Sequence, residues 1–227
     1  MSDRKRQLLE LLAQRPSPTR AAWRARAAIT LGLAVALALA IFAYAGGPRL
    51  EPRPLGLVAT TAAGAACVAA LALAGALGRG ASGLGHPRRT LLALMIGAPL
   101  TLLAWKWGWS ATSPDMIVAW TERPGLRCLA LSLSTGLPPL LALALLWRDR
   151  DPVHGTLTGA AMGVAAGACS WVLIDLWCPV GYPPHLLIGH LLPMGVLALT
   201  GAILGFKVIS LAEGGCRCSP PRARRPG

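Results

Sequence analysis

Long apolar runs alternate with short polar or charged links along most of the chain. Six of the runs are long enough to cross the hydrocarbon layer of a membrane as a single helix, which takes about 20 residues. They cover approximately residues 27–45, 55–77, 90–107, 126–147, 156–177 and 186–211. The pattern therefore predicts an all-α, polytopic membrane protein with six transmembrane helices.

The segments outside the six runs are short. Residues 1–26 form a basic lead, in which the leucines of residues 7–13 indicate about two turns of an amphipathic helix. The lead is too long and the first run too extended for a secretory signal, so we expect a retained anchor. Residues 212–227 form a basic, proline-rich tail that we expect to be disordered. Its Cys216 and Cys218 supply only two thiols, too few for a structural zinc site.

The positive charges predict how the helices are oriented. The chain has 22 Lys and Arg against 9 Asp and Glu, a formal net charge of +13. Most of the cations lie in the lead, in the links after the second and fourth runs, and in the tail, which all fall on one side. Because Lys and Arg mark cytoplasmic loops, both termini are predicted to be cytoplasmic. The charge follows the topology, so we expect contact with membrane lipids and no direct nucleic-acid binding.

Two cysteines lie at the ends of neighbouring runs. Cys128 opens the fourth run, Cys178 closes the fifth, and the short link between the runs predicts a hairpin with both thiols at its outer rim. In a bacterium that side is the periplasm, where disulfides persist. Cys128 follows Arg127 in the first turn of its helix, so the helix dipole and the guanidinium favour its thiolate. We interpret the three residues as a redox- or signal-sensing site; a permanent disulfide brace or two unrelated packing thiols are the alternatives.

The sequence offers weak candidates for a metal site. His185 begins the sixth run on the same predicted side as the two thiols, so Cys128, Cys178 and His185 are the candidate ligands. His190 follows five residues later, and that spacing places the two histidines on different faces of an α-helix. We therefore do not expect the two histidines to act together, and the sequence indicates no cofactor.

Asp175 is the one acidic residue inside the predicted spans, and Lys106 is a basic residue near the end of the third. An acid within a membrane helix is a candidate functional residue. Asp175 lies one turn before Cys178, near the rim, so we expect a carboxylate that is solvated or paired with Arg127. A transporter would be expected to show polar residues along a path, or a repeat between its halves, and neither is evident.

Small residues recur at helical spacing in two runs. Gly155, Gly159, Gly163 and Gly167 are each four residues apart in the fifth run, and alanines occupy positions 62, 66, 70 and 74 of the second. Both stripes predict faces where another helix backbone approaches closely.

No motif of an enzyme is present. The chain lacks a phosphate-binding loop, an H-E-x-x-H zinc motif and a nucleophile elbow. It also lacks a C-x-x-C pair, which argues against a thioredoxin-like or quinone-coupled oxidase. We expect no enzyme; a small transporter, a thiol-redox membrane protein and a purely structural membrane subunit stay as alternatives.

A resemblance to a known family rests on the two cysteine segments. Arg127-Cys128-Leu129, leading to Leu137-Pro138-Pro139-Leu140, resembles the first cysteine segment of the NrsF family, negative regulators of an extracytoplasmic-function sigma factor. Leu176-Trp177-Cys178-Pro179, with the apolar run that starts at His185, resembles the second. The resemblance covers most of residues 7–207, and the CarR-type anti-sigma proteins have a similar layout.

The resemblance implies a six-helix anti-sigma factor of the bacterial inner membrane. It would hold a sigma factor away from RNA polymerase on the cytoplasmic side and release it on oxidative, photo-oxidative or metal stress. The lead would bind the sigma factor through four leucines, Leu8, Leu9, Leu11 and Leu12. Modification at Cys128 and Cys178 would shift the fourth and fifth helices, with the glycine face of residues 155–167 allowing them to slide.

Overall fold

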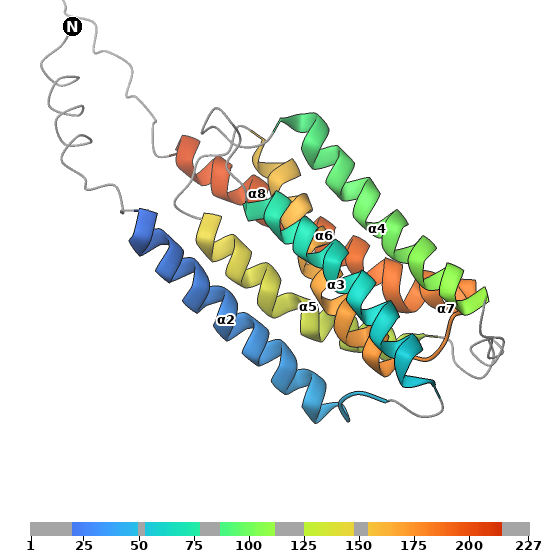
Figure 1. Cartoon of the computed structure of the whole chain (residues 1–227). Helices are drawn as coiled ribbons and strands as arrows, with labels where there is room; N and C mark the ends of the chain where they lie inside the picture. Colours follow the sequence, from blue (N-terminus) through green and yellow to red (C-terminus); the bar gives the residue numbers. More distant parts are fainter. Residues whose placement is uncertain (1–19, 50–52, 78–86, 112–124, 148–153, 215–227) are drawn as a thin grey trace, which may run out of the picture.

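A computed structural model describes residues 20–49, 53–77, 87–111, 125–147 and 154–214. All regular structure in these residues is helical, and Figure 1 shows the helices side by side in one bundle. They run in the order α2 (Arg20–Tyr44), α3 (Leu55–Leu77), α4 (Arg88–Ala111), α5 (Leu126–Trp147), α6 (Gly155–Trp177), α7 (Pro183–Leu186), the π-helix η2 (Leu187–Leu191) and α8 (Leu192–Gly214). The last three form one interrupted helix.

Six helices of the described part are long and apolar enough to cross a membrane: Ala21–Tyr44, Leu55–Leu77, Arg88–Ser110, Leu126–Trp147, Gly155–Trp177 and Pro183–Lys207. This confirms the predicted all-α class with six candidate transmembrane helices. The first helix begins at Arg20 and so includes the last residues of the predicted lead. The predicted amphipathic helix of residues 7–13 and most of the tail lie outside the described residues.

The outer surface of the bundle is apolar. Large side chains that are exposed include Ile29, Leu33 and Leu37 on α2, Leu71 on α3, Leu141 and Leu145 on α5, and Phe206 on α8. A water-soluble monomer rarely exposes so many large apolar side chains together. Hydrocarbon is the solvent that suits them, in agreement with a multi-pass membrane protein.

Long helices that follow one another in the chain run in opposite directions, which gives the bundle two distinct ends. We call the end where α2, α4 and α6 finish the cysteine end, and the end where α2 begins and α8 finishes the terminal end (Figure 1). Helix α6 lies at the centre, in contact with α3, α4, α5 and α8, and it is the most buried of the six spans.

The predicted glycine face of α6 is confirmed, and its partner is α8. A Cβ atom added to Gly159 would lie 2.0 Å from the carbonyl oxygen of Gly201, and one added to Gly163 would lie 2.1 Å from that of Leu197. Only glycine permits this backbone contact. Because the glycines face the sixth span, any sliding that this face allows is between the fifth and sixth spans.

The prediction that the alanine stripe of α3 packs closely against another helix is wrong. Ala66, Ala70 and Ala74 are exposed, whereas the buried small residues of this helix are Ala65, Ala69, Ala72 and Ala76. Both stripes repeat at helical spacing, so the one-sided pattern that normally identifies a buried face is missing. The choice between them is made by packing against α6 and α4, which are distant in sequence.

Candidate functional site

Two cysteines and two histidines meet at the cysteine end. The Sγ atoms of Cys128 and Cys178 lie 3.4 and 3.1 Å from Nε2 of His185, and the rings of His185 and His190 are 5.7 Å apart. One potential ligand atom from each residue lies within 4.8 Å of the other three. All four residues are at most 2% exposed. We call them the thiol–histidine cluster.

Glycines allow the first turn of α5 to approach this cluster. Gly125 precedes the helix with a φ of 86°, which an L side chain rarely adopts. A Cβ atom on Gly125 would lie 3.1 Å from the backbone nitrogen of Gly189, and one on Gly189 would lie 2.9 Å from Cβ of Cys128. The absence of both side chains therefore lets Cys128 lie directly against the segment that carries the histidines.

The π-helix η2 places both histidines on one face. In a regular α-helix, five residues turn the chain through about 500°, which leaves side chains about 140° apart. A π-turn closes an i→i+5 hydrogen bond and so accommodates one more residue per turn; here Leu192 N–H donates to the Leu187 carbonyl. His185 and His190 consequently share a face, and the expectation that they lie on different faces is wrong.

The irregular helix has a cause in the sequence. Pro193 has no N–H to donate to the carbonyl of Gly189, four residues earlier, and this breaks the α-helical bond pattern. The carbonyl oxygen of Gly189 instead accepts a hydrogen bond of 3.2 Å from Ser132 Oγ on α5. Pro193, three residues after His190, was the signal that the spacing of the histidines should not be interpreted with α-helical geometry.

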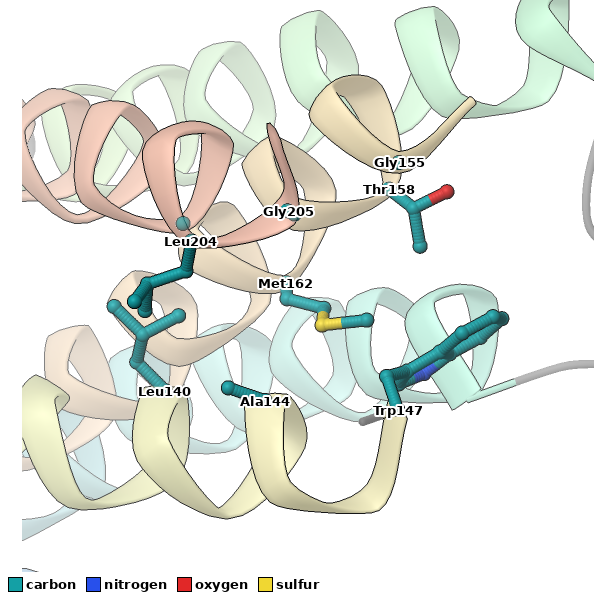
Figure 2. A pocket seen from close by; sticks show the side chains of 10 residues that line it. Leu140, Ala144, Trp147, Gly155, Thr158, Met162, Leu204 and Gly205 are labelled. Atoms are coloured by element: carbon teal, nitrogen blue, oxygen red, sulfur yellow. The ribbon is translucent and has the colours of Figure 1, made fainter. Parts of the chain in front are cut away.

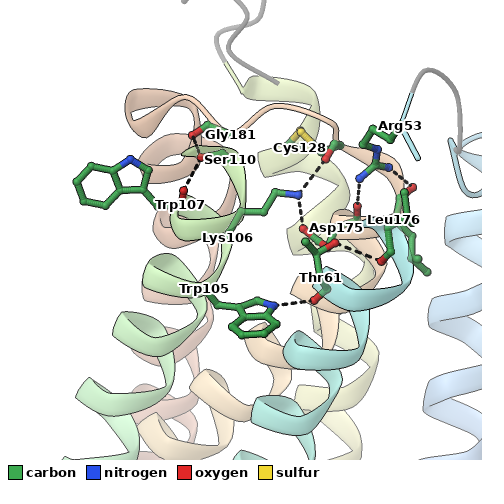
Figure 3. Close-up of polar contacts among 12 residues, drawn as sticks. Arg53, Thr61, Trp105, Lys106, Trp107, Ser110, Cys128, Asp175, Leu176 and Gly181 are labelled. Carbon is green, nitrogen blue, oxygen red and sulfur yellow. Dashed lines mark hydrogen bonds and ion pairs between the residues drawn. The ribbon is translucent and has the colours of Figure 1, made fainter. Parts of the chain in front are cut away.

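The C-terminal end of α6 is held by two arginines from the link between α2 and α3. The Arg53 guanidinium donates to the carbonyls of Asp175 and Leu176 at 2.8 and 2.9 Å, and the Arg49 N–H donates to that of Leu176 at 3.0 Å. These carbonyls carry the negative end of the helix dipole. The contacts shown in Figure 3 fix the backbone just before Cys178.

Asp175 is paired with Lys106 of α4, and the expectation of a solvated or Arg127-paired carboxylate is wrong. Lys106 Nζ donates to Asp175 Oδ1, and both side chains are 1% exposed. The same ammonium group lies 3.4 Å from the carbonyl oxygen of Cys178. The buried ion pair therefore adjoins the thiol–histidine cluster and connects it to α4.

A cavity of about 550 Å³ opens onto the cluster. It is lined by Arg49, Gly125, Leu126, Arg127, Cys128, Trp177, Cys178, Pro179, Val180 and His185. Arg127 is exposed, and the Arg49 guanidinium stacks 4.4 Å from the centre of the Trp177 ring. Small molecules and ions thus have a route to both thiols and one imidazole, past two positive charges.

The surroundings of Cys178 favour the thiolate form of its side chain. Cys178 lies just beyond α6, and the pKa of its thiol is held well below the ordinary value, chiefly because the Cys128 thiol hydrogen-bonds to it. Burial opposes this effect, and the His185 imidazole adds to it. The sequence predicted a favoured thiolate at Cys128 from its place on the helix, and that stays a prediction; the contacts in the structure favour the thiolate of Cys178.

A second cavity lies toward the terminal end, between α5, α6 and α8 (Figure 2). Its volume is about 40 Å³, and its lining is mostly apolar, including Leu140, Met162 and Leu204. Small-molecule sites commonly enclose about 300–1,000 Å³, so this one is a packing gap.

Of the other predicted site residues, the four leucines of the lead and the two tail cysteines lie outside the described residues.

The fold and the site together define the class of protein. It is a polytopic helical protein, whose described part brings two cysteines and two histidines together at one end of the bundle. The family model described as "Negative regulator of sigma F", NrsF, matches residues 12–210. The chain belongs to this family, as the resemblance predicted, and the family implies a sigma factor as its partner. No curated protein and no solved structure matches the chain.

Proposed function

We propose that the protein is a membrane-bound anti-sigma factor of the bacterial inner membrane. It binds an extracytoplasmic-function sigma factor on the cytoplasmic side and keeps it from RNA polymerase. The family match over residues 12–210 is the observation that carries this proposal. The apolar surface of the six helices supports a membrane location, and the positive-inside rule assigns the terminal end to the cytoplasm.

The proposed signal acts at the opposite end of the bundle. Oxidative, photo-oxidative or metal stress would alter the bonding of Cys128 and Cys178, and the sigma factor would then be released. The thiol–histidine cluster supports this proposal because its residues come from α5, the end of α6 and the interrupted last helix. A change in bonding there alters the spacing of three helix ends. No catalytic step is part of the proposal.

Two contacts support transmission from the cysteine end to the terminal end. Lys106 contacts both Asp175 and the carbonyl of Cys178, so a movement at the cluster also affects α4. The backbone contact between α6 and α8 continues from Gly167 down to Gly155 at the terminal end. Packed helices move as units, so these contacts provide a mechanical route between the two ends.

Co-purification tests the binding. The protein is extracted in detergent from cells and the captured proteins are identified by mass spectrometry. We expect the full-length chain and a chain lacking residues 215–227 both to capture a sigma factor. The amount captured should fall at least tenfold when the four leucines of the lead are changed to Ser, namely Leu8, Leu9, Leu11 and Leu12. Failure to capture any sigma factor would contradict the proposal; capture that survives the leucine changes would move the contact to the links.

A transcription reporter tests the signal. The variant with Cys128→Ser and Cys178→Ser should change the sigma-dependent response to oxidants or metal ions, while Cys67→Ser and Cys169→Ser, which alter thiols outside the cluster, should leave it intact. Immunoblotting of membranes would confirm equal amounts of each variant. An unchanged response of the double variant to every stress would remove the sensing role.

A further inference from the structure

We propose that the thiol–histidine cluster is a tetrahedral binding site for one divalent cation of the zinc class. Cys128 and Cys178 would bind the ion as thiolates, and His185 and His190 as neutral imidazoles. The proposal rests on the geometry of the four side chains and does not depend on the binding of a sigma factor.

The distances match those of a tetrahedral site. Zinc lies about 2.3 Å from thiolate sulfur and about 2.0–2.1 Å from imidazole nitrogen, so the ligand atoms of a tetrahedral site are about 3.3–3.8 Å apart. Nε2 of His185 lies 3.4 and 3.1 Å from the two sulfur atoms. All four ligand atoms lie within 4.8 Å of one another. Small side-chain rotations suffice to place them around one ion.

His190 provides an independent indication. Its side chain is 2% exposed, and neither ring nitrogen has a hydrogen-bond partner among the described residues. Buried polar atoms are nearly always paired, because an unpaired one loses its bonds to water without replacement. The ring packs against Trp171 and faces His185, at centroid distances of 5.0 and 5.7 Å. A cation within the cluster supplies one of these nitrogens with a bond.

The donor set selects the class of ion. Two sulfur and two nitrogen ligands in a tetrahedron are typical of zinc, whereas magnesium and calcium prefer oxygen. Two thiolates neutralise a divalent cation, so the occupied site has no net charge and its burial is not penalised as an isolated charge would be. Four protein ligands fill the coordination shell, which characterises structural or regulatory sites and leaves no position for substrate.

An ion can reach the ligands from solution. The cavity of about 550 Å³ is lined by Cys128, Cys178 and His185, three of the four proposed ligands. The ligands come from α5, the end of α6, α7 and η2, so a bound ion would fasten three helix ends to one another. Any effect of the bound ion on the release of a sigma factor rests on the proposed function, whereas the binding of the ion does not.

The test is a measurement of bound metal. The full-length chain, with Cys216→Ser and Cys218→Ser to remove the tail thiols, is purified in detergent under reducing conditions without a polyhistidine tag. After incubation with Zn²⁺ and desalting, we expect elemental mass spectrometry to find one zinc ion per chain. With Co²⁺, we expect the visible bands of a tetrahedral ion and a thiolate-to-cobalt charge-transfer band.

Matched variants distinguish the cluster from other thiols and imidazoles. Cys128→Ser and His190→Ala should each lower bound zinc at least tenfold after desalting. Cys169→Ser and His154→Ala change a cysteine and a histidine outside the cluster and should retain one zinc. If a cluster variant does not fold, X-ray absorption of the parent chain decides: two sulfur and two nitrogen neighbours support the site. No bound zinc in the parent chain, or full binding by the His190→Ala variant, would overturn the proposal.

Discussion

At the scale of single residues, the buried pair of Lys106 and Asp175 shows how charge is held within the bundle. Asp175 Oδ1 accepts from Lys106, while its other oxygen has no partner among the described residues. A buried ion whose partner is removed is costly, because neither water nor an opposite charge replaces the lost contact. The pair therefore couples α4 to α6 close to the thiol–histidine cluster.

Removal of one partner should destabilise the protein more than removal of both. We expect Lys106→Met to lower the free energy of unfolding by about 3–5 kcal/mol, and the double variant with Asp175→Leu to recover most of that loss. Thermal or denaturant unfolding in detergent micelles measures both. Lys207→Met, at an exposed position on α8, is the control for loss of an ammonium group. A single variant no less stable than this control would contradict the expectation.

The sequence identified both charged residues but not their contact. Lys106 and Asp175 are 69 residues apart, and nothing in either run indicates which helices are neighbours. The prediction that Asp175 lies near the rim is confirmed, since the pair lies beside the cysteine end. The prediction that it is solvated is wrong, because Arg49 and Arg53, from the link between α2 and α3, cover the end of α6.

At the scale of helices, the contact between α6 and α8 depends on missing side chains. A Cβ atom on Gly201 would lie 2.1 Å from the carbonyl oxygen of Gly159, and one on Gly205 would lie 2.2 Å from that of Gly155. Backbone atoms cannot rotate away as a side chain can. The two helices must therefore separate if either glycine is enlarged.

Two alanine substitutions in α8 should thus differ sharply. Gly201→Ala should destabilise the protein by about 1–3 kcal/mol through overpacking. Gly195→Ala, in the same helix, meets no atom within 4 Å and should be neutral or slightly stabilising, because alanine is the better helix former. The unfolding midpoints of the two variants in the same detergent provide the comparison. Equal effects would contradict the close backbone contact between α6 and α8.

The glycine face could be predicted from the sequence and the alanine face could not. Glycine is rare inside helices unless a close contact requires it, so a repeat at four-residue spacing is informative. Alanine suits every side of a helix, and α3 has it on several sides. The site was only half predictable for a related reason: the cysteines mark the ends of runs, whereas the pairing of His185 with His190 depends on a π-turn.

At the scale of the whole molecule, the proposed signal-sensing site and the proposed sigma-binding segment lie at opposite ends of the bundle, separated by its length. The thiol–histidine cluster lies at the cysteine end, and the lead that would bind a sigma factor joins α2 at the terminal end. An even number of spans places the start of α2 and the end of α8 on one side. The number of helices was predictable because hydropathy is local along the chain; their neighbours were not, because helix contacts are distant in sequence.

Accessibility of introduced thiols tests the orientation. Ser113→Cys, in the link between α4 and α5, should react with a membrane-impermeant maleimide added to cells with a permeabilised outer membrane, since that link is predicted to be periplasmic. Ser82→Cys, in the link between α3 and α4, should react only after the inner membrane is opened. Cys128→Ser, Cys178→Ser, Cys216→Ser and Cys218→Ser are included in both chains to remove the reaction of the native thiols. The reverse pattern of labelling would invert the proposed topology.

The π-helix η2 has a consequence for the length of related chains. A π-turn in an α-helix is equivalent to one inserted residue, which the wider turn absorbs without changing the phase of the helix on either side. A relative with one residue fewer in this segment would not need the π-turn and would have histidines four residues apart, again on a single face. Deletion of Ile188 should therefore keep the side chain of His185 beside that of His190 and leave Gly201 facing α6.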